Sequence, residues 1–248
     1  MKCLICGING KMGANLVELL KDDDTLSVAC GVDINCNGQG VPVYREFSAV
    51  KEKVDVIIDF SSPAVLKGEL SWAVKNSCPV VLASTGYSAD DLTLIDETAK
   101  KIAVFKTGNF SLGINLLVKL VKKAAETLGE GFDIEIVEKH HNQKVDAPSG
   151  TALMLAESAN SAFDGGKPFV NGRKGIVGKR GNEIGIHAVR GGTIVGEHEV
   201  MFAGEDEVIT LSHSARSKKV FAVGAIRAAK WLAGKPAGKY DMNDVLEI

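Results

Sequence analysis

Residues 2–13 decide the fold of this chain, and they read KCLICGINGKMG. The first apolar run, residues 3–6, predicts a short buried strand. The glycines at 7, 10 and 13 suit a tight turn into a helix, because glycine lets the backbone approach a pyrophosphate closely. We therefore expect this turn to bind the phosphates of a dinucleotide through amide groups at the helix start. The residues concerned are Gly7, Ile8, Asn9, Gly10, Lys11 and Met12.

An acidic residue at the end of the second predicted strand supports this interpretation. Asp33 follows Gly13 by about 20 residues, the spacing at which a carboxylate binds the adenosine ribose. Asn9 departs from the usual G-x-G-x-x-G pattern, although asparagine tolerates a left-handed backbone better than most residues. Residues 34–39 contain no lysine or arginine to pair with a 2′-phosphate, so we expect NADH to be preferred over NADPH. A strand-to-helix turn without a ligand is the alternative.

Short apolar runs alternate with helical periodicity in the first part of the chain. The runs are residues 3–6, 26–32, 54–60, 79–83 and 102–105. Between the first two, Met12, Leu16 and Leu20 recur at the spacing of one helical face. Five buried strands with intervening helices predict an α/β fold with a Rossmann-like, doubly wound parallel sheet.

Loops that follow the strands are further candidates for cofactor binding, because ligands of such sheets lie beyond the carboxyl ends of the strands. Small polar residues and glycines in these loops suit close contact with a ribose or a carboxamide. The residues expected to bind the cofactor are Ser84, Thr85, Gly86, Gly108, Asn109, Phe110 and Ser111, with residues 59–61 at the corresponding place after the third strand. For each loop alone, an ordinary turn is the alternative.

The pattern changes after a predicted helix at 112–128. Longer strand-like segments follow at 132–138, 183–189, 193–203 and 207–214, and the turns at 190–192 and 204–206 predict antiparallel neighbours. We expect a second α+β domain with a mixed or antiparallel sheet at 113–215. A final amphipathic helix at 220–232 needs a surface to bury against, so we expect it to pack on the first domain, formed by 1–112 and 216–248.

The densest chemistry lies in residues 135–152. Two imidazoles and an amine, His140, His141 and Lys144, are followed by Pro-Ser-Gly-Thr at 148–151, which predicts the start of a helix. The amides and dipole of a helix start favour a carboxylate, so the segment suggests an anionic substrate that needs proton donation. A zinc site is the rival interpretation, but adjacent histidines point apart on a strand and no further ligand lies nearby, so we expect no metal. A solvated polar loop is the other alternative.

Composition limits the possible partners and compartments. The chain has 248 residues with 29 basic and 31 acidic side chains, so no basic field favours nucleic acid or a membrane surface. Five cysteines, all in the first third, do not form a disulfide framework. The Cys3-x-x-Cys6 pair lies in a strand, where buried hydrophobic roles are favoured over redox chemistry. Without a membrane-length apolar stretch or a signal-peptide cleavage region, a cytoplasmic protein with reduced thiols is expected.

Residues 138–152, EKHHNQKVDAPSGTA, resemble the signature E-x-H-H-x-x-K-x-D-x-P-S-G-T-A of the 4-hydroxy-tetrahydrodipicolinate reductase (dihydrodipicolinate reductase) family. The tail is also similar, at residues 213–216, 221–225 and 238–242, so the resemblance spans essentially the whole chain. Two rivals are another NAD(P)-dependent amino-acid or semialdehyde dehydrogenase and a non-enzymatic NAD(H)-binding redox sensor. The first has no reason to carry the His-His-x-x-Lys loop, and the second should show a DNA-binding segment or a partner surface.

The resemblance implies an enzyme of the diaminopimelate route to lysine. It implies reduction of the cyclic dicarboxylate 4-hydroxy-tetrahydrodipicolinate to tetrahydrodipicolinate with NADH or NADPH, by hydride transfer to C4 and loss of water. His140 and Lys144 would be the proton donors, His141 would contact the substrate, and Gly150 and Thr151 would bind a substrate carboxylate. It also implies a homotetramer formed through the sheet of the second domain.

Overall fold

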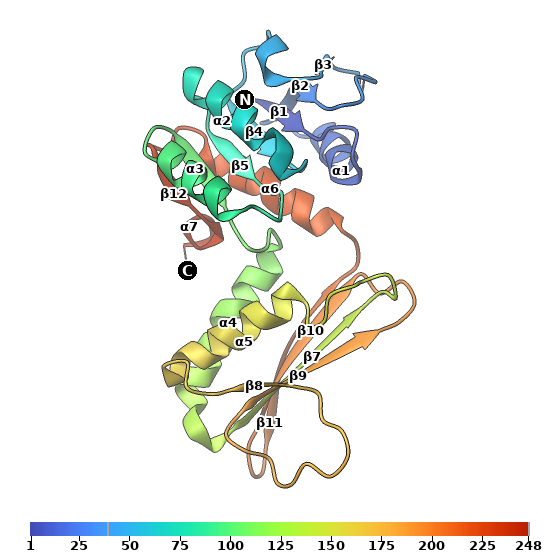
Figure 1. Ribbon diagram of the computed structural model, residues 1–248, viewed down its shortest axis with the longest axis vertical. Helices are drawn as coiled ribbons and strands as arrows, with labels where there is room; N and C mark the ends of the chain where they lie inside the picture. Colours follow the sequence, from blue (N-terminus) through green and yellow to red (C-terminus); the bar gives the residue numbers. More distant parts are fainter. Residues whose placement is uncertain (39, 248) are drawn as a thin grey trace. The chain divides into compact units, whose positions relative to one another are not determined.

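The computed structural model describes residues 1–38 and 40–247, so Gln39 and Ile248 lie outside the described residues. The chain divides into two compact units (Figure 1). Unit 1 contains Met1–Ser111 and Lys219–Glu247, and unit 2 is the continuous stretch Leu112–Lys218 between them.

Unit 1 is built on a seven-stranded sheet in which all paired strands are parallel, in the order β12-β6-β5-β4-β1-β2-β3. The strands are β1 Lys2–Cys6, β2 Ser27–Val32, β3 Val43–Tyr44, β4 Val56–Asp59, β5 Val80–Leu82, β6 Ala103–Lys106 and β12 Gly238–Tyr240. The five predicted strands are confirmed. The sequence pattern missed β3 and β12, because strands of two and three residues are too short to show a periodicity.

Helices cover both faces of this sheet. They are α1 Lys11–Leu20, α2 Leu66–Lys75, α3 Ala89–Ala99, α6 Lys219–Leu232 and α7 Met242–Leu246, with short 3-10 helices η1 Phe47–Ala49 and η2 Pro63–Val65. Helix α6 packs beside α1 and against β4, β5 and β6. Leu4 and Cys6 of β1 belong to the core that includes Leu66 and Leu70 of α2. The doubly wound fold class is therefore confirmed.

Unit 2 is a five-stranded mixed sheet in the order β11-β10-β7-β9-β8. Its elements are α4 Leu112–Leu128, η3 Gly129–Gly131, β7 Asp133–His140, α5 Gly150–Asn160, η4 Ser161–Phe163, β8 Phe169–Asn171, β9 Ile184–Arg190, β10 Gly196–Ala203 and β11 Val208–Ala215. Helices α4 and α5 pack together, and their apolar residues share one core with Ile136, Val200 and Phe202 of the sheet. The second predicted fold class, an α+β unit with a mixed sheet, is confirmed.

One predicted strand pairing in unit 2 is wrong. The turn at 190–192 was expected to join antiparallel neighbours, but β7 lies between β9 and β10 and pairs with both. Strand β10 begins at Gly196, so residues 191–195 form a connection that is long enough to pass over one strand, a distance of about 10 Å. The turn at 204–206 does join neighbours, because β10 and β11 form an antiparallel hairpin.

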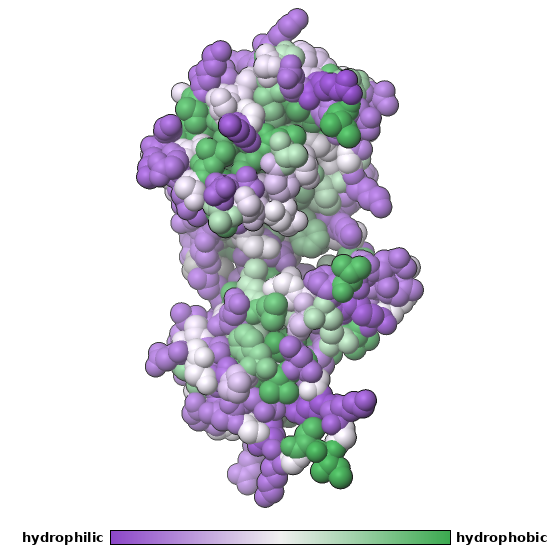
Figure 2. Space-filling view, in the orientation of Figure 1, coloured by the Kyte–Doolittle hydropathy of each residue, from purple (hydrophilic) through white to green (hydrophobic). Residues whose placement is uncertain are grey.

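Figure 2 shows one face of the molecule, on which hydrophilic side chains predominate. No helix within residues 1–38 and 40–247 is long and apolar enough to cross a membrane.

Candidate functional site

The predicted cofactor residues meet at one edge of the unit 1 sheet. The register pairs Cys6 with Asp59, Asp59 with Leu82 and Leu82 with Lys106, so these strands end at the same level. The loops that follow β1, β2, β5 and β6 contain the turn 7–12, Asp33, residues 84–86 and residues 108–111. The structure therefore places all four predicted segments at the carboxyl edge of the parallel sheet.

Two glycines of the first turn have no room for a side chain. Gly7 has a φ of +77°, and a Cβ there would lie 2.9 Å from the carbonyl oxygen of Phe60. A Cβ on Gly13 would lie 2.2 Å from the carbonyl oxygen of Gly7, so α1 packs directly on the turn. No side chain caps the start of α1 at Gly10, which leaves the first-turn amides for an anion. The Ile8 side chain is buried, so only the backbone of this residue is available to a ligand at the turn.

Asn9 and Asp33 connect the first turn to the loop after β2. The Asn9 amide donates to Oδ2 of Asp33 at 3.0 Å, and the Asn9 side chain donates to the carbonyl oxygens of Asn35 and Asn37. The Asn35 amide donates to the other Asp33 oxygen at 3.0 Å. The backbone amide of Asn9 thus holds the Asp33 carboxylate, and the asparagine side chain, which departs from the glycine pattern, holds the loop after β2.

A cavity of about 320 Å³ lies beside this carboxylate. Gly7, Gly10, Asp33, Ile34 and Arg45 are among the residues that line it. Its glycines and open helix start suit the phosphates of a dinucleotide, and its carboxylate suits the adenosine ribose. The residues present therefore fit the cofactor that the sequence implies.

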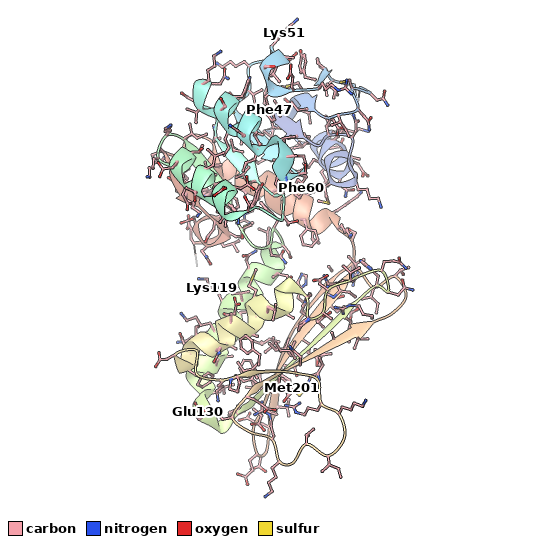
Figure 3. All side chains as sticks on the ribbon, in the orientation of Figure 1. Phe47, Lys51, Phe60, Lys119, Glu130 and Met201 are labelled. Carbon is pink, nitrogen blue, oxygen red and sulfur yellow. The ribbon has the colours of Figure 1, made fainter. Side chains whose placement is uncertain are left out.

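Buried Asp59 links two of the loops at this edge. It accepts hydrogen bonds from the amide and hydroxyl of Ser61 and from the Ser84 hydroxyl, the last at 2.7 Å. Burial raises the pKa of the Asp59 carboxyl, against the hydrogen bonds from the two serines. Phe60, labelled in Figure 3, packs its ring 5.9 Å from that of Phe110. Phe110 itself is buried, so its side chain supports the loop from within.

The signature residues of unit 2 run from strand β7 to helix α5. His140 is the last residue of β7, and Lys144 lies in the loop that follows. Gly150 and Thr151 are the first residues of α5, whose N-cap Ser149 accepts a hydrogen bond from the Ala152 amide. A Cβ on Gly150 would meet nothing within 4 Å, so the start of this helix is open.

His140 is oriented by a buried carboxylate. Its Nδ1 atom lies 2.6 Å from Oε2 of Glu138, which is fully buried. Burial would raise the pKa of Glu138, but hydrogen bonds from Arg190, His140 and the Ser149 amide lower it below its ordinary value. The ionised carboxylate accepts only, so Nδ1 of His140 is the donor. A Cβ on Gly196 would lie 3.2 Å from Nε2, and glycine there leaves room beside this nitrogen.

Lys144 is held by an aspartate two residues away. Its ammonium donates to both carboxylate oxygens of Asp146, at 2.6 and 2.8 Å. The hydrogen bond from Lys144 lowers the pKa of Asp146. Arg190 donates to the carbonyl oxygen of Asp146 at 2.6 Å, which fastens the loop to strand β9.

Two further histidines differ in their surroundings. His141 Nδ1 is buried and has no hydrogen-bond partner among the described residues. His198 of β10 has its Nε2 atom 3.0 Å from the Ser149 hydroxyl, and its ring lies 5.1 Å from that of His140. Burial and the neighbouring His140 lower the pKa of His198 to about 4, so His198 is neutral at pH 7.

Family models match both units of the chain. "Dihydrodipicolinate reductase, N-terminus" matches residues 1–110, and "Dihydrodipicolinate reductase, C-terminus" matches residues 113–246. The chain belongs to the dihydrodipicolinate reductase family. The resemblance predicted from residues 138–152 is confirmed.

Two curated relatives of this family are similar over their full lengths. The 4-hydroxy-tetrahydrodipicolinate reductase of Caldanaerobacter subterraneus subsp. tengcongensis is 50% identical over 248 residues, covering 100% of this chain and 98% of the relative. The reductase of the same name from Clostridium tetani is 43% identical, covering 99% of this chain and 97% of the relative. A solved dihydrodipicolinate reductase from Paenisporosarcina sp. TG-14, bound to dipicolinate, has a TM-score of 0.82 at 24% identity and covers 97% of each chain, which shows the shared fold.

Sequence reasoning missed several residues around the reductase-family signature. Glu138 lies two residues before His140 on a strand, hence on the same face, and this spacing is a signal that the sequence carries. Arg190 and His198 gave no such signal, because they come from β9 and β10 and meet Glu138 only through the sheet register. In unit 1, Arg45 was missed because β3 places it near Asp33 in space.

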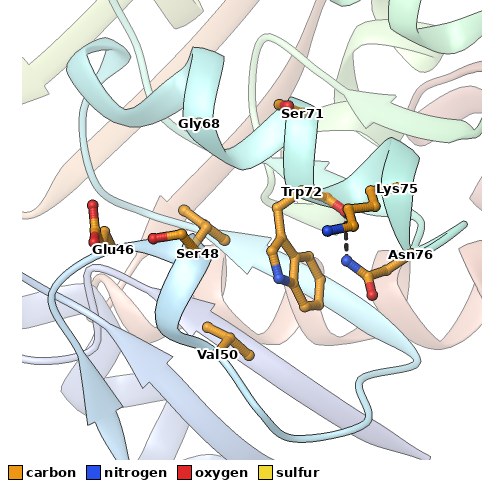
Figure 4. A pocket seen from close by; sticks show the side chains of 9 residues that line it. Glu46, Ser48, Val50, Gly68, Ser71, Trp72, Lys75 and Asn76 are labelled. Carbon is orange, nitrogen blue, oxygen red and sulfur yellow. Dashed lines mark hydrogen bonds between the residues drawn. The ribbon is translucent and has the colours of Figure 1, made fainter.

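A second cavity in unit 1, of about 480 Å³, lies away from the predicted site residues (Figure 4). It is lined by residues of η1 and α2, among them Ser48, Ser71, Trp72, Lys75 and Asn76. None of the predicted site residues lines this cavity. Across the described residues, no group of three or more histidine, cysteine, aspartate or glutamate side chains could hold a metal ion.

Proposed function

We propose that this chain reduces 4-hydroxy-tetrahydrodipicolinate to tetrahydrodipicolinate with NADH or NADPH. The observation that carries this proposal is a single network in unit 2. Glu138 and Arg190 connect the His140 ring, the loop of Lys144 and the open start of α5. Proton donors beside an anion-binding helix start suit a dicarboxylate substrate.

Unit 1 would hold the cofactor. The turn 7–12 would bind the pyrophosphate, Asp33 the adenosine ribose, and residues 84–86 and 108–111 the nicotinamide half. Loss of the 4-hydroxyl as water would first leave a conjugated imine, and the bound dinucleotide would then supply a hydride to C4 of that ring. NADH is the preferred form in this proposal, because Asp33 would repel a 2′-phosphate.

Unit 2 would hold the substrate. The first-turn amides of α5, at Gly150 and Thr151, lie at the positive end of the helix dipole and would bind one carboxylate. The Lys144 ammonium would attract the substrate carboxylates, and the half-buried His141 would contact the ring substituents.

His140 and Lys144 would supply the proton. As C4 takes up hydride, an electron pair moves through the conjugated system to the ring nitrogen, which must be protonated. With Nδ1 of His140 bonded to Glu138, Nε2 is the nitrogen that carries the transferable proton. The Lys144 ammonium stabilises the same developing charge electrostatically.

The homotetramer and the cytoplasmic location are parts of the same proposal. The face of the unit 2 sheet opposite α4 and α5 carries partly exposed residues such as Val137, Val189 and Met201. Exposed Ile176 and Val177 follow β8 in the same unit. Light scattering should give four times the 26.2 kDa chain mass, and a monomer mass would contradict this part.

The cytoplasmic prediction rests on the unpaired cysteines of the described chain.

The experiment is a turnover assay with substrate made in place. An aldolase condenses pyruvate and aspartate semialdehyde, and oxidation of NADH or NADPH is followed by absorbance after the purified chain is added. We also expect dipicolinate, the ligand of the Paenisporosarcina enzyme, to bind the wild-type chain and compete with substrate. Absence of substrate-dependent NADH or NADPH oxidation would contradict the proposed function.

A further inference from the structure

Glu138 makes more contacts than orientation of one histidine requires. Its Oε1 atom accepts from the Ser149 amide at 2.9 Å and from Arg190 at 2.8 Å. Its Oε2 atom accepts from His140 at 2.6 Å and from the other Arg190 nitrogen at 2.8 Å. A carboxylate has about four lone-pair directions, so all of them are used. Glu138 is also fully buried, and it therefore does not touch the substrate.

The partners of Glu138 come from three different elements. His140 is on β7 itself, Arg190 is the last residue of β9, and Ser149 is the N-cap of α5. His198 of β10 is the register neighbour of Glu138 on the other side of β7. The proton donor and the helix start that would bind carboxylate are thus bonded to the two oxygens of one side chain.

Arg190 extends the connection to the second proton donor. Besides its two bonds to Glu138, it donates to the Asp146 carbonyl oxygen, next to the carboxylate that holds Lys144. The amide that follows Arg190 is also held, since Gly191 donates to the His140 carbonyl oxygen at 2.9 Å. An arginine suits this place, because its planar guanidinium donates to the two Glu138 oxygens through separate nitrogens and also bonds the Asp146 carbonyl oxygen.

We propose that Glu138, clamped by Arg190, is the positioning residue that sets the distance between the proton donor His140 and the carboxylate-binding start of α5. This role rests on the proposed function and adds a residue to it. A displacement of reacting groups by about 1 Å can lower a rate by about 10²-fold. One buried carboxylate bonded to both groups prevents such a displacement.

The test compares Glu138→Gln with Glu135→Gln. Glutamine keeps the shape of Glu138 but removes the charge and one acceptor. Glu135 is a matched control on the same strand, since it also binds two arginines but lies on the opposite face of the sheet. For Glu138→Gln we expect kcat to fall by about 10²-fold and the dissociation constant of dipicolinate to rise about 10-fold. The KM for NADH should stay near its wild-type value, because Glu138 lies in unit 2 and the cofactor is proposed to bind unit 1.

A second variant covers the case in which Glu138→Gln fails to fold. Arg190→Lys keeps the positive charge but cannot donate to both Glu138 oxygens and to Asp146 together, so it should move kcat and dipicolinate affinity in the same direction. Light scattering checks that each variant keeps the wild-type mass. Equal kcat and equal dipicolinate affinity in Glu138→Gln and Glu135→Gln would overturn the positioning role. Failure of the wild-type chain to turn over would instead overturn the proposed function.

Discussion

Both carboxylate oxygens of Asp146 lie within hydrogen-bonding distance of the Lys144 ammonium, at 2.6 and 2.8 Å. The lysine is only 20% exposed, although it lies in a loop. Its charge is therefore placed before any substrate arrives, and little reorganisation is needed when negative charge develops nearby.

Removal of this ammonium should lower turnover strongly. For Lys144→Ala we expect kcat to fall by about 10²-fold or more, the scale of general acid catalysis. Lys139→Ala is the control, because Lys139 pairs with Glu197 and plays no part in the proposed mechanism. Steady-state oxidation of NADH measures both variants. Near-normal kcat in Lys144→Ala would contradict its assignment as a proton donor.

The cofactor preference should depend on Asp33. In Asp33→Ser the carboxylate that repels a 2′-phosphate is gone, so the ratio of kcat/KM for NADH to that for NADPH should fall about 10-fold. Asp22→Ser, in an exposed acidic stretch outside the cavity, should leave the ratio unchanged. A wild-type KM for NADPH at or below that for NADH would remove the basis of the prediction. Such a result would draw attention to Arg45, which lines the same cavity.

Glycine at position 185 should be required by a neighbouring ion-pair network. A Cβ on Gly185 would lie 1.9 Å from Oε2 of Glu135. The Glu135 carboxylate is bonded to Arg173 and His187 through Oε2 and to Arg180 through Oε1. These bonds lower the pKa of Glu135 to about 2 even though its burial acts in the opposite direction. Gly185→Ala should therefore cost about 1–3 kcal/mol in the free energy of unfolding. In a Glu135→Ala background the cost of Gly185→Ala should largely vanish. Urea unfolding of the wild type, the two single variants and the double variant measures this, and additive costs of the two substitutions would contradict the prediction.

His198 should make the stability of the protein depend on pH. Its pKa is lowered by burial from 6.5 to about 4 in the folded chain. Below pH 6.5 the unfolded chain takes up a proton that the folded chain does not, so stability is lost as the pH falls toward 4, at about 1.4 kcal/mol per pH unit. His198→Gln should reduce the difference in unfolding free energy between pH 7 and pH 5. Burial also lowers the pKa of His213, but His213 is present in both the wild type and the variant, so it contributes equally to the pH dependence of each. Identical pH dependence in the two proteins would contradict this prediction.

The fold was predictable where each element carries its own pattern. Residues 3–6 and 54–60 predict strands, because continuous apolar runs of that length suit a sheet buried on both faces. The pairing of β7 between β9 and β10 was not predictable, since turn chemistry at 190–192 indicates that the chain reverses but not which strand it lies beside. Strand order in a mixed sheet depends on packing over the whole unit.

The candidate site was predictable to the same extent. His140, Lys144, Gly150 and Thr151 lie close together in sequence, so their pattern indicated proton donation beside a helix start. The network that holds them involves Arg190 and His198, which follow Glu138 by more than fifty residues in the first case and by sixty in the second. Distant partners of this kind become visible only when the register is known.

The division of unit 1 into two stretches has a consequence for its synthesis. All of unit 2 leaves the ribosome as one continuous piece, Leu112–Lys218, before β12 has been made. Until that strand arrives, β6 has β5 on one side and an open row of backbone donors and acceptors on the other. The nascent chain therefore carries an unpaired strand edge from the synthesis of β6 until β12 emerges and covers it.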